Sequence, residues 1–187
     1  MKMGLILIDI QNDYFKGGKN ELFQPEEAVL KAKKVLSFFR EKSLPVLHIQ
    51  HISMGKEAGF FIPETYGVEI YKEVYPKEEE LVITKHNPDS FFQTKLKKSL
   101  EDKSITHLVI CGMMTHMCVD TTVRSARNFG YNVTLIEDAC ATKNLVWAEN
   151  IIPASTVQRT FMASLNTTFA DIMTADQWVR EHYTILM

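Results

Sequence analysis

The chain has 187 residues, which corresponds to about one domain of ordinary size. Hydrophobic residues make up 45% and charged residues 24%, proportions that exclude a largely disordered chain. The formal net charge is −2 and no long basic block occurs, so we expect no nucleic-acid binding and no polybasic membrane anchor.

The apolar pattern alternates between short continuous runs, typical of buried strands, and stripes at intervals of three and four, typical of helices. In chain order it predicts a strand at 5–8, a helix at 25–42, strands at 44–49 and 81–84, a helix at 91–100, a strand at 107–111, a helix at 118–129, a strand at 132–136, a helix at 155–165, a strand at 169–173 and a helix at 174–181. The first apolar run is too short for a membrane span or a signal peptide.

This alternation predicts an α/β fold, with a six-stranded, mostly parallel sheet between two layers of helices. No linker or internal repeat divides the chain, so we expect a single domain over residues 1–187. One segment, from about 51 to 80, has little periodicity and many aromatic residues. It is either a surface excursion, which covers the core or contacts another subunit, or a lid or wall of a binding pocket.

Three reactive side chains follow predicted strands. Asp9 ends the first strand, Lys85 follows the strand at 81–84, and Cys118 lies just beyond the strand at 107–111. Right-handed crossovers place the carboxyl ends of parallel strands along one edge of the sheet, where ligands bind. We therefore expect these three residues, distant in sequence, to meet in one site.

The position of Cys118 at the start of a predicted helix suits a nucleophile. Helix N–H groups and the positive end of the helix dipole favour a thiolate, and the same N–H groups can hold an oxyanion. Asp9, at the end of an apolar strand, is suited to act as a general base, with Lys85 as its compensating charge. The alternatives are a core cysteine, a turn-capping aspartate and a surface lysine.

The remaining polar residues give weaker signals. His48 and His51, three positions apart on a strand, point to opposite faces, so we expect no shared metal ion. His86 and His116 lie nearer the predicted site, and a Cys–His dyad stays open. No glycine-rich phosphate loop occurs, and we expect no cofactor. The three cysteines lack CxxC spacing, which favours a reducing, cytoplasmic setting.

Three segments resemble the motifs of the isochorismatase-like cysteine hydrolases. They are the opening stretch 7–15 (LIDIQNDYF), the lysine stretch 85–92 (KHNPDSFF) and the cysteine stretch 111–122 (CGMMTHMCVDTT). The later stretch 137–142 (EDACAT) fits as well. The resemblance spans nearly the whole chain in the right order, and it implies the family's Rossmann-like three-layer fold.

The resemblance implies a catalytic triad of Asp9, Lys85 and Cys118. It also implies a non-proline cis bond between Met113 and Met114, with the Met114 and Cys118 amides forming the oxyanion hole. The activity it implies is hydrolysis of an amide bond in a small molecule through a thioester. Family members commonly form dimers or tetramers, so we expect a homodimer or homotetramer.

Departures from neighbouring subfamilies narrow this expectation. Nicotinamidases carry a metal-binding Asp and His two residues apart, and the corresponding stretch, His51-Ile52-Ser53, lacks that pair. Isochorismatases often lack the cysteine, so Cys118 favours amide over vinyl-ether hydrolysis. We expect Phe15, Phe91 and His116 to line the substrate pocket.

Other classes stay open beside the hydrolase. Asp9 at the tip of a first strand is also compatible with a non-catalytic α/β binding or signalling module that accepts a phosphoryl group, and Cys118 with a redox thiol protein. Thiol labelling separates them: a catalytic thiolate should react with iodoacetamide well below the ordinary cysteine pKa of about 8.5.

Overall fold

The computed structural model describes residues 2–55 and 57–185. Its main sheet has six strands in the order β3-β2-β1-β4-β5-β8, and every neighbouring pair is parallel. The strands are β1 (Met3–Ile8), β2 (Val46–His51), β3 (Leu81–Lys85), β4 (His107–Met113), β5 (Asn132–Ala141) and β8 (Asp171–Met173). The expected α/β fold with a six-stranded parallel sheet is confirmed.

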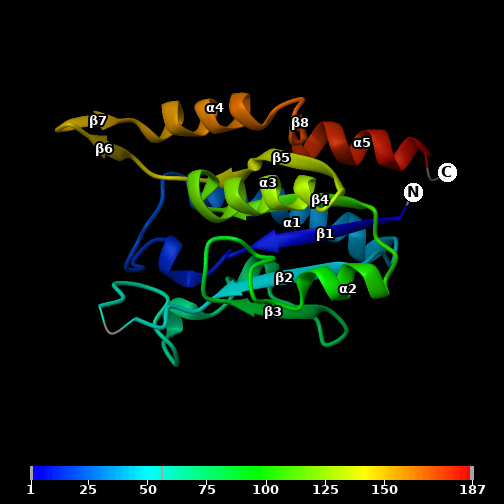
Figure 1. Cartoon of the computed structure of the whole chain (residues 1–187), viewed down its shortest axis with the longest axis horizontal. Helices are drawn as coiled ribbons and strands as arrows, with labels where there is room; N and C mark the ends of the chain where they lie inside the picture. The colour runs from blue at the N-terminus through cyan, green and yellow to red at the C-terminus, as the bar shows by residue number, and fades with distance from the viewer. Residues whose placement is uncertain (1, 56, 186–187) are drawn as a thin grey trace.

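Helices cover both faces of this sheet (Figure 1). They are α1 (Pro25–Glu41), α2 (Leu96–Asp102), α3 (Asp120–Asn128), α4 (Ala154–Leu165) and α5 (Ala175–Ile185). Helices α1 and α5 pack against each other and against β5 on one face, whereas α3 and α4 contact each other on the opposite face. No helix among residues 2–55 and 57–185 is long and apolar enough to cross a membrane.

The core begins with the sequence of β1, in which residues 4–8 are all buried. A strand buried on both faces needs a continuous apolar run, because helices cover it on each side. Helix α1 begins at Pro25, with two glutamates in its first turn, as the sequence predicts. Phe38 and Phe39 of this helix pack around the fully buried Trp178 of α5.

Two predicted helices have different starts in the structure. The helix expected at 91–100 begins only at Leu96. Before it, the Phe91 N–H donates to Asp89 Oδ1 and the Thr94 hydroxyl donates to the Ser90 carbonyl, so local side-chain bonds replace a helical turn. The helix expected at 118–129 begins as a π-helical turn, η4 (Thr115–Val119), which continues into α3.

A hairpin of β6 (Leu145–Trp147) and β7 (Asn150–Ile152) is absent from the sequence prediction. It projects from the body beyond β5 and α4 (Figure 1). Its turn residues, Ala148 and Glu149, have φ of 46° and 66°. Tight hairpin turns of this kind normally contain Gly or Asn, so the sequence carried no turn signal here.

The segment 51–80 is attached to the end of β1 by backbone and side-chain bonds. The Asn12 N–H donates to the Glu69 carbonyl, and the Tyr71 N–H donates to the Ile10 carbonyl. Asp13 accepts the Phe61 N–H at 2.7 Å. The segment is thus anchored to the loop that follows the first strand.

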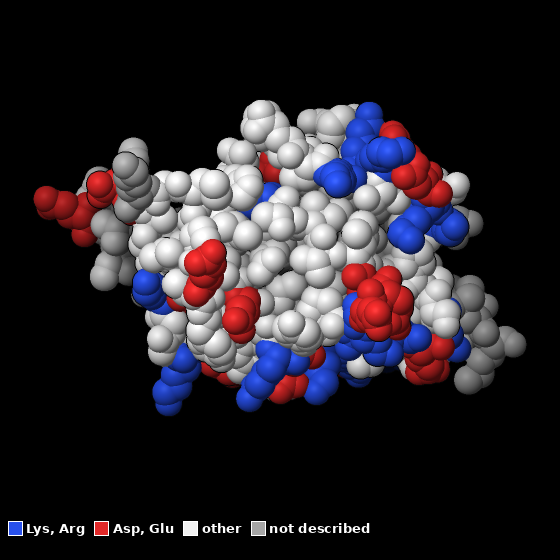
Figure 2. All heavy atoms as spheres, turned by 90° about the horizontal axis from the view of Figure 1, so that it is seen from below, with Lys and Arg blue, Asp and Glu red and all other residues white. Residues whose placement is uncertain are grey.

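On the face seen in Figure 2, charged side chains of both signs lie mostly around the rim and form no continuous patch of one sign.

Candidate active site

The strand order creates a switch point between β1 and β4. From β1 the chain runs to β2 and β3 on one side, and from β4 it runs to β5 and β8 on the other. Ligands of open parallel sheets bind at such a point, outside the carboxyl ends of the strands. Asp9 directly follows β1, Lys85 ends β3, and Cys118 lies in η4 after β4. The fold therefore brings the three sequence-predicted residues to one place.

Close backbone contact holds β1 and β4 together at this point. Gly112 has a φ of +141°, and a Cβ there would lie 2.1 Å from the Ile8 carbonyl oxygen. Only glycine fits this position. Next to it, Asp9 has a φ of 50°, a left-handed conformation that Asp tolerates better than most residues. This turn directs the Asp9 carboxylate into the protein.

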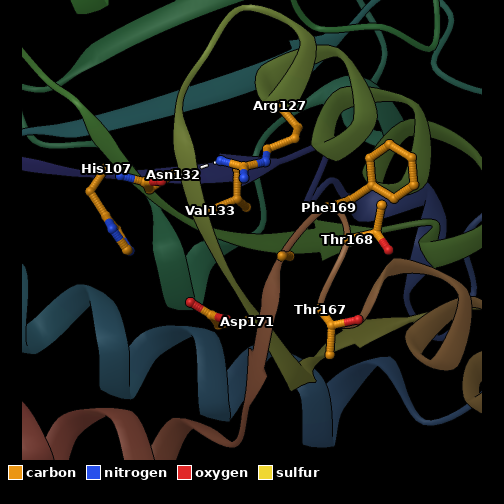
Figure 3. Close-up of a pocket in the computed structure, with 9 residues that line it drawn as sticks. His107, Arg127, Asn132, Val133, Thr167, Thr168, Phe169 and Asp171 are labelled. Atoms are coloured by element: carbon orange, nitrogen blue, oxygen red, sulfur yellow. Dashed lines mark hydrogen bonds between the residues drawn. The ribbon is translucent and has the colours of Figure 1, made fainter.

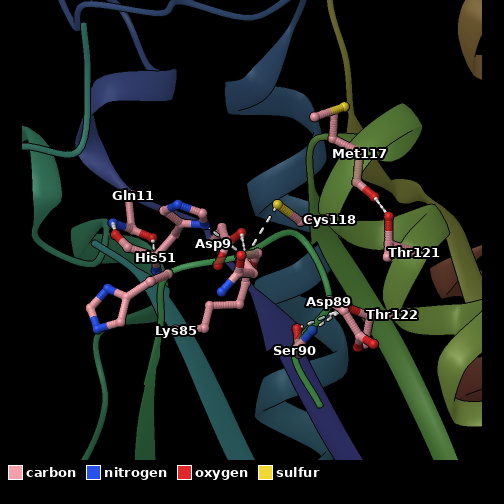
Figure 4. Close-up of polar contacts among 12 residues, drawn as sticks. Asp9, Gln11, His51, Lys85, Asp89, Ser90, Met117, Cys118, Thr121 and Thr122 are labelled. Atoms are coloured by element: carbon pink, nitrogen blue, oxygen red, sulfur yellow. Dashed lines mark hydrogen bonds and ion pairs between the residues drawn. The ribbon is translucent and has the colours of Figure 1, made fainter. Parts of the chain in front are cut away.

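The Lys85 ammonium lies at the centre of the site (Figure 4). Its Nζ is 2.8 Å from Asp9 Oδ2 and 3.2 Å from Cys118 Sγ. Both charged side chains are fully buried, whereas Cys118 keeps a relative exposure of 5%. The three residues, called the triad below, thus form a buried group of a carboxylate, an ammonium and a thiol, of which Cys118 is the most exposed residue.

The segment that carries Cys118 has an unusual backbone. The Met113–Met114 peptide bond is cis, as the resemblance implied. The N–H groups of Met117 and Val119 both donate to the Met114 carbonyl. The Met114 N–H itself has no acceptor among the described residues. Ser90 fixes the neighbouring lysine loop to α3 through its hydroxyl, 2.8 Å from Thr122 Oγ1.

The protonation of the site differs from the sequence expectation. Burial raises the pKa of the Cys118 thiol, the Asp9 carboxylate raises it further, and the nearby Lys85 ammonium only partly opposes them. In the free site, burial and Asp9 therefore favour the neutral thiol, whereas the helix start considered alone favours the thiolate. Burial is also the largest influence on Lys85 and lowers its pKa, but Asp9 and Cys118 together leave that pKa raised and the ammonium charged.

One neighbour of the triad was missed as a site residue. His51 ends β2 and lies in register with Lys85 on β3, and its Nδ1 is 2.9 Å from Lys85 Nζ. The register of parallel strands was the signal that could have found it. His48, by contrast, contacts Glu80 through Nε2 at 2.8 Å, away from the triad.

Aromatic side chains flank the triad on the side of the 51–80 segment. The Tyr14 ring lies 4.7 Å from the Phe61 ring and 5.9 Å from the Phe60 ring, and Phe61 in turn lies 5.9 Å from His51. Burial raises the pKa of the Tyr14 phenol, and the nearby Cys118 and Asp9 raise it further. Sequence reasoning chose Phe15 where the structure places Tyr14.

The three expected pocket residues lie elsewhere. Phe15 stacks on Tyr71, with ring centroids 3.6 Å apart, beside a hollow of about 440 Å³ that no triad residue lines. Phe91 packs against Phe129, at the carboxyl end of α3, far along the helix from Cys118. His116 contacts Thr142 Oγ1 through Nδ1 at 2.6 Å, because residues two apart in a helix face different directions.

A separate hollow of about 320 Å³ opens at the opposite edge of the sheet (Figure 3). It is lined by His107, Asn132 and Asp171, which begin β4, β5 and β8, and by Arg127, which donates to Asn132 Oδ1 at 3.3 Å. This hollow lies at the amino ends of the strands. The triad, at the carboxyl ends, is the candidate active site.

Comparison with known proteins identifies the family. A family model described as the isochorismatase domain matches residues 3–177. The uncharacterized isochorismatase family protein YddQ of Bacillus subtilis (strain 168) is 49% identical over 180 residues, covering 96% of this chain and 100% of that protein. A crystal structure of a putative isochorismatase hydrolase from Oleispira antarctica has a TM-score of 0.93 and 41% identity, covering 96% of each chain.

A more distant relative is the ureidoacrylate amidohydrolase RutB of Variovorax paradoxus (strain S110). It is 27% identical over 124 residues, which cover 66% of this chain and 46% of that protein. The family match over nearly the whole chain and the shared fold agree with each other. The chain is a member of the isochorismatase family of hydrolases.

Proposed function

We propose that the protein hydrolyses an amide bond of a small molecule, with Cys118 as nucleophile. The observation that carries this proposal is the ordered chain of Asp9, Lys85 and Cys118, with contacts of 2.8 Å and 3.2 Å in a buried site. A thiol beside a carboxylate and an ammonium has the parts needed for acyl transfer. The relative named as an amidohydrolase supports the same reaction class.

In the proposed reaction, the Cys118 thiol gives its proton to Asp9 as the sulfur attacks the carbonyl carbon. The Met114 and Cys118 N–H groups hold the oxyanion, and Lys85 compensates the charge of Asp9 and the sulfur. The C–N bond then breaks, and Asp9 gives the proton to the departing amine. Water attacks the thioester, Asp9 accepts its proton, and that proton returns to Cys118 as the acid leaves.

The surroundings favour a small substrate with a flat or apolar group. The rings of Tyr14, Phe60 and Phe61 contact one another, and Phe61 lies 5.9 Å from the His51 ring, so this side of the site is aromatic and uncharged. A charged substrate group would lose its water here without an opposite charge, because Asp9 and Lys85 already pair with each other.

Activity profiling tests the proposal. Amides, carbamoyl compounds and lactams are offered to the wild type, to Cys118→Ala and to Cys140→Ala, with release of ammonia or amine as the readout. Cys140 is a matched control because it is equally buried, but on β5. We expect hydrolysis by the wild type and the control, and loss of about 10³-fold or more in kcat/KM for Cys118→Ala. Vinyl-ether hydrolysis that survives Cys118→Ala would overturn the proposal.

We also propose that the chain associates with a second copy of itself through the β6–β7 hairpin. Val146, Trp147 and Ile151 are 68%, 78% and 68% exposed on it. An isolated two-stranded hairpin is marginally stable in water and has unpaired edges. Trp147 alone offers about 200 Å², a quarter of the ~800 Å² that each partner buries in a standard interface. A two-fold interface uses every such side chain twice.

Sedimentation velocity measures this association. The wild type should sediment as a dimer or tetramer, and the Val146→Thr/Trp147→Ser/Ile151→Thr variant as a smaller species. Phe129→Ser is the control, because Phe129 is 48% exposed at the end of α3, away from the hairpin. A monomeric wild type, or a hairpin variant with unchanged mass, would overturn the proposal.

A cytoplasmic location is a further part of this proposal. It is supported by the three cysteines, Cys111, Cys118 and Cys140, which are all free and buried. Cell fractionation tests it, and recovery of the protein outside the cytoplasm would contradict it.

A further inference from the structure

His51 is the one side chain outside the triad whose ring contacts the Lys85 ammonium among the residues that the structure describes. We propose that His51 is a positioning residue: its neutral ring accepts a hydrogen bond from Lys85 and so holds the ammonium between Asp9 and Cys118. This inference rests on the proposed function, because it assigns the residue that keeps the proposed triad in order.

The contacts of Lys85 Nζ show why a positioning residue is needed. The ammonium has three protons to donate. Its partners are Asp9 Oδ2 at 2.8 Å, His51 Nδ1 at 2.9 Å, the Asn87 carbonyl oxygen at 3.0 Å and Cys118 Sγ at 3.2 Å. Two of these partners take part in the proposed chemistry, and the other two are neutral acceptors that stay the same throughout. An ammonium buried to this degree cannot turn to water instead.

The backbone of His51 is itself held in place. Gln11 Oε1 accepts the His51 backbone N–H at 2.8 Å, and Gln11 Nε2 donates to the His51 backbone carbonyl at 2.9 Å. The same amide donates to the Val68 carbonyl at 2.8 Å, which links His51 to the 51–80 segment. Since Gln11 is fully buried, it fixes the backbone at the end of β2, from which the His51 ring extends toward Lys85.

The charge state of His51 agrees with this role. The pKa of His51 is lowered to about 4, mainly by burial and next by the Lys85 ammonium; Asp9 raises this pKa and His86 lowers it, each by a smaller amount. At neutral pH the ring is uncharged. Because Nδ1 accepts from Lys85, the ring proton lies on Nε2.

The same atoms suggest a competing role. Ligand atoms of Asp9, His51 and Cys118 lie within 4.8 Å of one another, which is close enough for one divalent cation. However, Lys85 Nζ contacts all three of these side chains and so occupies the space between them. The geometry therefore indicates that the positive charge between these side chains is the Lys85 ammonium and not a metal ion. Zinc binding by the wild type is one of the results that would contradict this.

The test uses His51→Ala, His51→Asn and a control, His86→Ala. Asparagine places its Oδ1 where histidine has Nδ1, so it can accept the same bond. His86 is an exposed neighbour whose Nδ1 contacts the Ile52 carbonyl at 2.8 Å. Thermal unfolding first checks that each variant is folded.

Two readouts follow, and neither needs a substrate. In ¹⁵N-lysine spectra, the signal of the Lys85 ammonium is assigned by its loss in Lys85→Met. We expect a signal protected from exchange with water in the wild type, His51→Asn and His86→Ala. We expect this signal to be lost in His51→Ala. Alkylation of Cys118 at pH 9 should slow about tenfold in His51→Ala alone, because an ammonium that moves away from the sulfur no longer lowers the thiol pKa.

Three results would overturn the assignment. The first is an ammonium signal and an alkylation rate in His51→Ala that equal those of the wild type. The second is a His51→Asn variant that lacks the wild-type signal and rate, and the third is a wild type that binds one equivalent of zinc and loses the ammonium signal. An amide panel without activity would overturn the proposed function and leave this assignment standing.

Discussion

The ammonium of Lys85 lies 2.8 Å from the carboxylate of Asp9, and both side chains are fully buried. Such a pair is strongly coupled, because removal of one partner leaves the other charge buried without compensation. We therefore expect Asp9→Asn and Lys85→Met each to lower the free energy of unfolding by about 3 kcal/mol. The double variant should lose less than the sum of the two.

Urea denaturation measures this coupling. The matched control is the exposed pair Lys98 and Asp102 on α2, whose charged atoms lie 3.2 Å apart. Lys98→Met should change the free energy of unfolding by at most about 0.5 kcal/mol, since solvent screens the pair. Additive losses at Asp9 and Lys85 would contradict a coupled buried pair.

A second prediction concerns the protonation of Cys118. Burial and the Asp9 carboxylate raise the pKa of the thiol. Asp9→Asn removes the negative charge, so the thiol pKa should fall and iodoacetamide should alkylate Cys118 faster at pH 7.5. Each unit of that fall gives up to about tenfold in rate. Hydrolysis should nevertheless decrease, because the general base is lost.

Peptide-level mass spectrometry measures the alkylation of Cys118 in the wild type and in Asp9→Asn. Lys85→Met should change the rate in the opposite direction, because the ammonium lowers the thiol pKa. Slower alkylation in Asp9→Asn would show that Asp9 does not raise the thiol pKa.

The pH dependence of stability gives a third prediction. The pKa of His51 is about 4 in the folded protein, below its ordinary value of 6.5. Between pH 6.5 and 4, the unfolded chain binds a proton that the folded protein does not, so the contribution of His51 to stability falls as the pH falls. Above pH 6.5 the ring is neutral in both states and has no such effect.

Urea denaturation of the wild type and His51→Asn, from pH 7.5 to pH 5, tests this sign. The stability advantage of the wild type over the variant should shrink as the solution becomes more acidic. The other histidines are common to both proteins and cancel in the difference. A difference that stays constant or grows toward pH 5 would contradict a lowered His51 pKa.

Gly112 gives a fourth prediction, which concerns the junction of β1 and β4. A Cβ at this position would lie 2.1 Å from the Ile8 carbonyl oxygen. Gly112→Ala should therefore lower the free energy of unfolding by about 3 kcal/mol or more. Gly130→Ala, at φ +87° with no atom within 4 Å of the added Cβ, should cost about 1 kcal/mol. Equal losses in the two variants would contradict a close approach at Gly112.

The sequence was informative where one local pattern determines the structure. The buried run of β1 and the amphipathic stripe of α1 predict their elements to within two residues at each end. The sheet topology then brings Asp9, Lys85 and Cys118 together, as predicted. The hairpin was missed because Ala148 and Glu149 adopt a turn that neither residue type signals.

Other errors come from tertiary context. The helix start was expected to favour the thiolate of Cys118, but its pKa also depends on burial and on Asp9, which only the folded structure shows. Phe91 was expected to line the pocket, whereas a turn directs it to Phe129. His51 was considered only as a possible metal ligand, although strand register pairs it with Lys85.

The central claim, that Cys118 forms a thioester with the acyl part of an amide, is tested most directly by intact-protein mass spectrometry. A substrate found by profiling is mixed with the enzyme and quenched in acid within the first turnover. We expect a mass increase equal to the acyl group, mapped to the peptide that contains Cys118 and absent from Cys118→Ala. Continued hydrolysis by Cys118→Ala at the wild-type rate, without any adduct, would contradict it.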